Sequence, residues 1–95
     1  MQVYYVTFHY QERWYYKVGI TSLVPIRKRF GRYWKKYQFR LITSWPFNNK
    51  IEATTFEQAL LRRLRSDHSR PNILPFPAIS GNTEIFYSDV LELDR

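Results

Sequence analysis

The first part of the chain has the pattern of a β-hairpin, two apolar runs with a polar break between them. Residues 3–8 (VYYVTF) are rich in β-branched and aromatic side chains, which suit a pleated and half-buried strand. Gln11, Glu12 and Arg13 interrupt this pattern with polar side chains, and residues 14–20 resume it. We therefore expect two antiparallel strands joined by a short turn.

Two later stretches have the periodicity of amphipathic helices. After Pro25, a residue type favoured in a first helical turn, apolar positions recur at spacings of three and four, with Gly31 as a weak point in the middle. These positions are Ile26, Phe30, Tyr33, Trp34 and Tyr37. A second helix is expected to run to about Ser66, on an apolar face made of Ala53, Phe56, Leu60 and Leu64.

The remaining segments complete one α+β domain. Residues 39–45 (FRLITSW), closed by Pro46, predict a third strand, and residues 48–50 predict a loop. Pro71, Pro75 and Pro77 indicate an irregular surface loop. Residues 83–87 predict a short strand, and Ser88 and Asp89 a cap for a last helical turn. The order β-β-α-β-α predicts a single domain over residues 1–95, with a small three-stranded antiparallel sheet flanked by helices and a short β/α tail.

Composition excludes several classes of protein. A chain of 95 residues has room for one core. Its 44% hydrophobic content argues against intrinsic disorder. The absence of cysteine excludes a disulfide framework, a thiolate zinc site and a cysteine nucleophile. Since no apolar run approaches about 20 residues and the first residues lack the layout of a signal peptide, we expect a cytoplasmic protein with no membrane partner.

Charge is concentrated in one part of the chain. Fifteen basic and eight acidic side chains leave a net charge of +7, and the stretch from Arg13 to Lys50 has ten basic residues and no acid. We call seven of these residues the basic strip: Arg27, Lys28, Arg29, Arg32, Lys35, Lys36 and Arg40. Contacts with phosphates release counterions, and interleaved rings such as Trp34 can stack on bases, so the strip predicts a nucleic-acid partner. The alternative is a solvated helix face.

Four short motifs occur in an order that resembles the GIY-YIG endonuclease superfamily. They are residues 3–6 (VYYV), residues 16–21 (YKVGIT) followed by Arg27, residues 53–57 (ATTFE), and residues 81–86 (GNTEIF). More narrowly, they are similar to the phage and bacterial branch in which the second motif reads Lys-Ile-Gly. This resemblance covers nearly the whole chain. It implies hydrolysis of nucleic-acid phosphodiesters with one Mg²⁺ (or Mn²⁺), with DNA as the expected substrate, in a bacterial cell or encoded by a phage.

The resemblance also assigns roles to four residues. Glu57 would be the metal ligand, because Mg²⁺ prefers oxygen donors and keeps several waters, so that one carboxylate can suffice. Glu52 is the competitor, but it lies at the start of the helix. Arg27, eight residues after Gly19, would hold phosphate oxygens with its guanidinium group. Tyr4 and Lys17 would share the tasks of general base and positioning group.

The choice between these last two stays open. The commoner family pattern has Tyr at both positions, whereas a Lys titrates near pH 10.4 and needs desolvation or nearby cations to act as a base. Tyr5 is the alternative to Tyr4 in the neighbouring register, and Tyr16 should face away from Lys17. Gly19 is expected to allow a close approach or a bend in its strand.

Two residues near the end of the chain have weaker assignments. Asn82 fits either a place near the metal or a plain turn, and Glu84 is expected to be structural. The alternative function is a non-catalytic basic module that binds nucleic acid on the same fold, and a third class is a protein-interaction module that docks through its acidic C-terminus. A homodimer or a partner protein would supply specificity that one small domain lacks.

Overall fold

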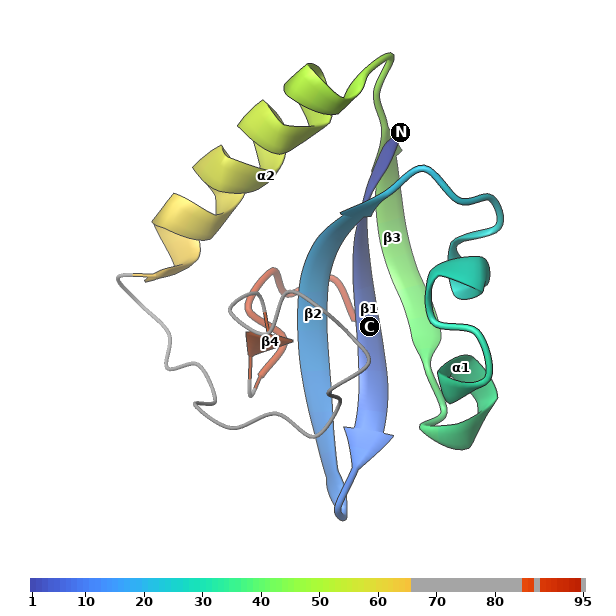
Figure 1. The fold of residues 1–95 in the computed structure, drawn as a ribbon. Coiled ribbons are helices and arrows are strands. Elements are labelled where there is room, and N and C mark those ends of the chain that lie inside the picture. The colour runs from blue at the N-terminus through green and yellow to red at the C-terminus, as the bar shows by residue number, and fades with distance from the viewer. Residues whose placement is uncertain (66–84, 87, 95) are drawn as a thin grey trace.

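The computed structural model describes residues 1–65, 85–86 and 88–94. It is an α+β fold on an antiparallel sheet with strand order β3-β1-β2-β4. Figure 1 shows α2 on one side of this sheet and α1 on the other. The elements are β1 (Gln2–Tyr10), β2 (Arg13–Thr21), the 3₁₀ turn η1 (Ile26–Arg29), α1 (Tyr33–Lys36), β3 (Arg40–Pro46), α2 (Lys50–Arg65) and β4 (Ile85–Phe86).

The predicted hairpin is confirmed, and its turn sets the register of the sheet. Gln11 and Glu12 occupy the turn with φ of 48° and 65°, a left-handed conformation that matches the twist of the paired strands. The register that follows pairs Tyr4 with Gly19 and Val6 with Lys17. Residues that lie directly opposite one another in antiparallel strands project to the same face, so this register decides which side chains share a face.

The sheet has four strands, where the sequence predicted three. Ile85 and Phe86, from the short strand expected in the tail, pair with Lys17 and Tyr16 on the outer edge of β2. Both side chains are fully buried, one in each core cluster, which explains why this short strand joins the sheet.

Each face of the sheet has its own core. On the face that we call the α1 face, Tyr4, Val6 and Phe8 pack against Ile26, Phe30 and Phe39. On the opposite face, the α2 face, Val3, Tyr5 and Val18 pack against Ala53 and Leu61. Alternate residues of β1 therefore serve two separate clusters, so its central positions, residues 3–8, are all buried.

The first predicted helix is wrong as a single element. It is divided into η1 and α1, and between them Gly31 has a φ of +55°, a left-handed conformation that interrupts the helix. Its apolar positions still face the sheet, because Phe30 and Trp34 stack on Phe39 with ring centroids 4.4 and 5.6 Å apart.

The second predicted helix is confirmed, with an earlier start. Asn49 caps it by accepting a hydrogen bond from the backbone N–H of Glu52 at 2.9 Å, so Lys50 is helical and not part of the loop. No helix in the described part of the chain is long and apolar enough to span a bilayer. The proline-containing loop, Asn82 and Glu84 lie outside the described residues.

The expected last helical turn is also wrong. After Asp89 the chain makes a turn, in which the backbone N–H of Glu92 donates to the carbonyl of Asp89 at 3.0 Å. The Asp89 carboxylate accepts hydrogen bonds from the N–H groups of Leu93 and Asp94 at 3.3 and 2.8 Å. A side chain that binds these N–H groups offers the backbone an alternative to the helix.

Candidate functional site

Tyr4 and Lys17 lie on the same face of the sheet. Lys17 is paired with Val6, which belongs to the α1-face core together with Tyr4. Both side chains are nearly covered, with 1% of Tyr4 and 2% of Lys17 exposed. The register thus brings together the two residues to which the resemblance gives the base and positioning roles.

Gly19 makes room for the ring of Tyr4. A Cβ added at Gly19 would lie 2.5 Å from Cζ and 3.0 Å from Cε2 of Tyr4, and closer still to its hydroxyl oxygen. The ring also meets Phe30 edge-on, with centroids 5.6 Å apart. The expected close approach at Gly19 is therefore present, and the partner is the side chain of Tyr4 from the neighbouring strand.

Tyr5, the alternative in the neighbouring register, has a different role. Its hydroxyl donates to Asp89 Oδ1 at 2.6 Å and accepts from the N–H of Leu91 at 3.4 Å. Burial, followed by the hydrogen bond to the Asp89 carboxylate, raises the pKa of Tyr5 far above its usual range. A hydroxyl that is engaged in this way and resists ionisation makes a poor general base, which favours Tyr4.

Tyr16 faces away from Lys17, as expected, and anchors the C-terminal segment. It stacks on Tyr5 with centroids 6.0 Å apart, and its hydroxyl donates to Asp94 Oδ2 at 3.0 Å. Burial and the hydrogen bond to Asp94 raise the pKa of Tyr16. Sequence reasoning missed these links between tyrosines and carboxylates, since residues 78 to 84 positions apart give no local signal.

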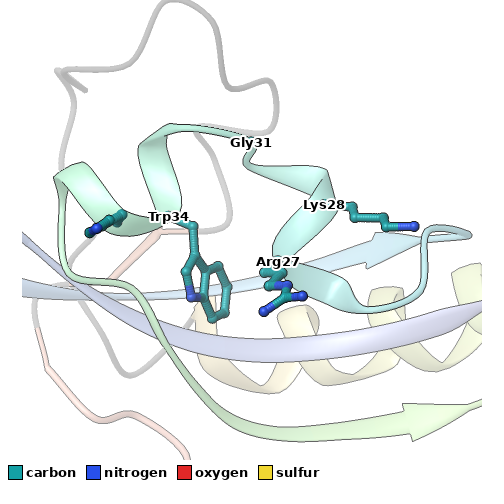
Figure 2. A pocket seen from close by; sticks show the side chains of 5 residues that line it. Arg27, Lys28, Gly31 and Trp34 are labelled. Carbon is teal, nitrogen blue, oxygen red and sulfur yellow. The ribbon is translucent and has the colours of Figure 1, made fainter.

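Arg27 belongs to the segment that covers the α1 face. It lies in η1 next to Ile26, which is buried against that face, while the side chain of Arg27 is exposed. Figure 2 shows Arg27 and Trp34 projecting in the same direction from neighbouring turns, with Lys28 projecting away from them. Together with Gly31 and Lys35 these residues line a hollow of about 270 Å³, which we call the Trp34 hollow.

The structure divides the basic strip into groups with different surroundings. Arg27, Lys28 and Lys35 line the Trp34 hollow. Arg32 lies over the ring of Tyr33 and Lys36 over that of Tyr37, at 5.6 and 5.3 Å from the ring centroids, and these two rings stack on each other. Arg29 lies 6.0 Å from the centroid of Phe30 and lines a second hollow with Lys50 near Met1.

Arg40, a member of the strip, has an acidic partner. Its guanidinium group contacts both carboxylate oxygens of Asp94, at 2.8 and 3.0 Å. A phosphate that binds Arg40 has to compete with this ion pair. Ion pairs at the surface contribute little stability, about 0 to 1 kcal/mol, so a polyanion can displace Asp94 from Arg40.

Glu57 lies on the other side of the sheet from Tyr4 and Lys17. It is one helical turn from both Ala53 and Leu61, which are buried against the α2 face, and only 6% of it is exposed. Its competitor Glu52 is exposed in the first turn of α2. The sheet therefore separates the side of α2 that carries Glu57 from the segment that carries Arg27 (Figure 1).

The donor chemistry of Glu57 suits Mg²⁺, since carboxylate oxygens are the ligands that this ion prefers and water can complete its shell. Within residues 1–65, 85–86 and 88–94, no three His, Cys, Asp or Glu side chains form a metal-binding group. Two acids of the C-terminal turn, Asp89 and Asp94, are already engaged by tyrosine hydroxyls, N–H groups and Arg40. From the described residues, a site at Glu57 would have one carboxylate.

Comparisons with protein-family models, with curated proteins and with solved structures find no match to this chain. The resemblance to GIY-YIG nucleases stays a prediction that rests on the four motifs in the sequence.

Proposed function

We propose that this protein binds nucleic acid through the surface of η1 and α1 and hydrolyses phosphodiester bonds of DNA with Mg²⁺. The observation that supports this most directly is the hairpin register. It puts Tyr4 and Lys17 on one face of the sheet, and the segment that carries Arg27 packs on that same face. A base, a positioning group and a phosphate-binding cation are the protein groups that this hydrolysis needs.

In this proposal each side chain has one task. Arg27 binds the scissile phosphate, because its guanidinium group stays charged and can contact two oxygens at once. Tyr4 and Lys17 orient the attacking water and take its proton, and which of them is the base is a matter for experiment. The resemblance gives Glu57 the Mg²⁺, which would supply positive charge to the leaving oxygen. The place of Glu57 on the α2 face, across the sheet from Arg27, counts against this role.

A second candidate function is nucleic-acid binding without cleavage. The position of Glu57 favours binding without cleavage, because Glu57 lies on the α2 face of the sheet and Tyr4 on the α1 face. The burial of Tyr4, Lys17 and Glu57 favours it too, since a substrate has to reach groups that expose 1%, 2% and 6% of their surface. The exposed basic side chains of η1 and α1 are sufficient for this function.

Incubation of supercoiled plasmid with the purified protein, with Mg²⁺ or with EDTA, distinguishes the two functions. We expect the protein to nick the plasmid in the presence of Mg²⁺ and not in EDTA. Glu57→Gln keeps the size of the side chain and removes its charge, so we expect the rate to fall by about 100-fold or more while binding measured in EDTA is unchanged. Glu52→Gln is the matched control, because the same change on an exposed residue of the same helix should leave the rate unchanged.

Either of two results contradicts the nuclease. Absence of Mg²⁺-dependent nicking by the parent, together with tight DNA binding, supports the binding module. Nicking by Glu57→Gln at the parent rate shows that Glu57 is not the metal ligand.

A further inference from the structure

We propose that the Trp34 hollow binds an unpaired nucleotide, with its base stacked on Trp34 and its phosphates held by Arg27, Lys28 and Lys35. The partner is therefore a single strand, or a duplex region in which one base has left the stack. This inference rests on the proposed nucleic-acid binding and does not depend on cleavage.

The indole of Trp34 is held in place by the core. It stacks on Phe39, with centroids 5.6 Å apart and ring planes 16° from parallel, and it also contacts Phe30 at 5.9 Å. Both partners are buried, whereas Trp34 itself is partly exposed. A ring that is already ordered loses little conformational entropy when a ligand stacks on it.

Gly31 lines the hollow beside open space. Its φ of +55° lets the chain turn between η1 and α1, and a Cβ added there would meet no atom within 4 Å. Trp34 and three cations surround this opening (Figure 2), and none of the acidic side chains that the structure describes lines it. An aromatic face beside positive charge is the combination that binds a base together with its phosphate.

The other aromatic side chains of the segment are less suitable. Tyr33 and Tyr37 stack on each other at 5.9 Å, and each has a cation from its own segment over the ring, Arg32 and Lys36 respectively. Among the aromatic residues that the structure describes, Trp34 is the one that lines the hollow.

The chemistry of the hollow selects against a regular duplex. In a double helix each base is stacked on both faces by its neighbours, so it has no face to offer to an indole. An unpaired base has such a face, and stacking on an aromatic side chain contributes about 1 to 3 kcal/mol per base. The cations contact phosphates in both forms, so only the contribution of Trp34 should distinguish them.

Fluorescence anisotropy in EDTA tests this inference without cleavage. The probes are a labelled single-stranded DNA of about 12 nucleotides, the RNA of the same sequence, and the matching duplex DNA. We expect Trp34→Leu to weaken binding of both single strands by about 5- to 150-fold, which is the stacking energy converted at 1.4 kcal/mol per factor of ten. Binding of the duplex should change less than about twofold.

Trp14→Leu is the matched control. Trp14 lies on β2 near the hairpin turn and is 43% exposed, so the same change there should leave every affinity unchanged. Circular dichroism during thermal unfolding reports whether each variant is folded. Equal losses for single strand and duplex, or no loss for either, would overturn the inference.

A second measurement decides the matter if Trp34→Leu does not fold. In the variant Trp14→Phe/Trp45→Phe, Trp34 is the single tryptophan, and stacking of a base should quench its fluorescence. We expect saturable quenching by the single strands and much less by the duplex. Absence of quenching at concentrations where anisotropy shows binding overturns the inference. If the parent nicks plasmid but shows no quenching, the proposed nuclease is supported and the nucleotide site at the Trp34 hollow is not. If quenching occurs without nicking, the nucleotide site is supported and the nuclease is not.

Discussion

Replacement of Gly19 by Ala should reveal how closely Tyr4 lies against β2. The added Cβ would lie 2.5 Å from Cζ of Tyr4, well inside van der Waals contact. The ring cannot easily move away, because it is 1% exposed and lies edge-on against Phe30. Overpacking of a core in this way typically costs about 1 to 3 kcal/mol of stability.

Whether Gly19→Ala destabilises or stabilises the folded protein should depend on Tyr4. Without the contact, Ala in a strand is more stable than Gly by about 0.5 to 1 kcal/mol, because it loses less backbone entropy on folding. Tyr4→Leu removes all three atoms that approach Gly19, namely the hydroxyl oxygen, Cζ and Cε2. In that background Gly19→Ala should therefore be neutral or stabilising by up to about 1 kcal/mol.

Urea denaturation of the four proteins of this double-mutant cycle measures the coupling. Gly31→Ala is the control, because its cost comes from a φ of +55° and not from a steric contact, so it should be the same in both backgrounds. If Gly19→Ala costs less than about 0.5 kcal/mol in the parent, or costs the same in both backgrounds, the ring of Tyr4 does not lie on Gly19 and the reasoning is refuted.

Three further predictions concern ionisation, charge and the base. Because the pKa of Tyr5 is raised, the folded state holds the phenol proton more tightly than the unfolded state, in which Tyr titrates near pH 10. The free energy of unfolding should therefore keep its full value below that pH and fall above it by up to about 1.4 kcal/mol per pH unit. Tyr5→Phe should flatten this decline in urea titrations between pH 9 and 11, and an equal decline in both proteins would contradict the assignment. Neutralising Lys28 and Lys35 together should reduce the slope of log affinity for duplex DNA against log salt by about 0.9 per lost contact, and an unchanged slope removes the Trp34 hollow from the interface. Lys17→Arg should be almost inactive in plasmid nicking if Lys17 is the base, since guanidinium does not give up its proton, whereas full activity together with a large loss in Tyr4→Phe assigns that role to Tyr4.

Local pattern predicted the elements whose determinants are close in sequence. The β-branched and aromatic runs in residues 3–20 and the polar break between them predicted the hairpin, and the periodicity of Ala53, Phe56 and Leu60 predicted α2. The weak point at Gly31 was visible as well, but not its left-handed conformation, which divides the first predicted helix. The basic strip could be found by counting charges, because charge is a property of the side chains themselves.

Tertiary structure decided how these residues are combined. Alternation predicts that Tyr4 and Tyr5 face opposite sides, yet only the register set by the turn at Gln11 and Glu12 puts Tyr4 with Lys17, since a slip of one residue would exchange the faces. Likewise Tyr5 is engaged by Asp89, from 84 residues away.

The basic strip and Glu57 show the same division between local pattern and packing. The strip is continuous in sequence, but packing gives Arg40 an acidic partner, places Arg32 over Tyr33, and leaves three cations around Trp34. The periodicity of α2 puts Glu57 on its buried side, while the face of the sheet that it meets depends on where the connection after β3 leads the chain. Periodicity describes one element at a time, whereas contacts between elements depend on the path of the whole chain.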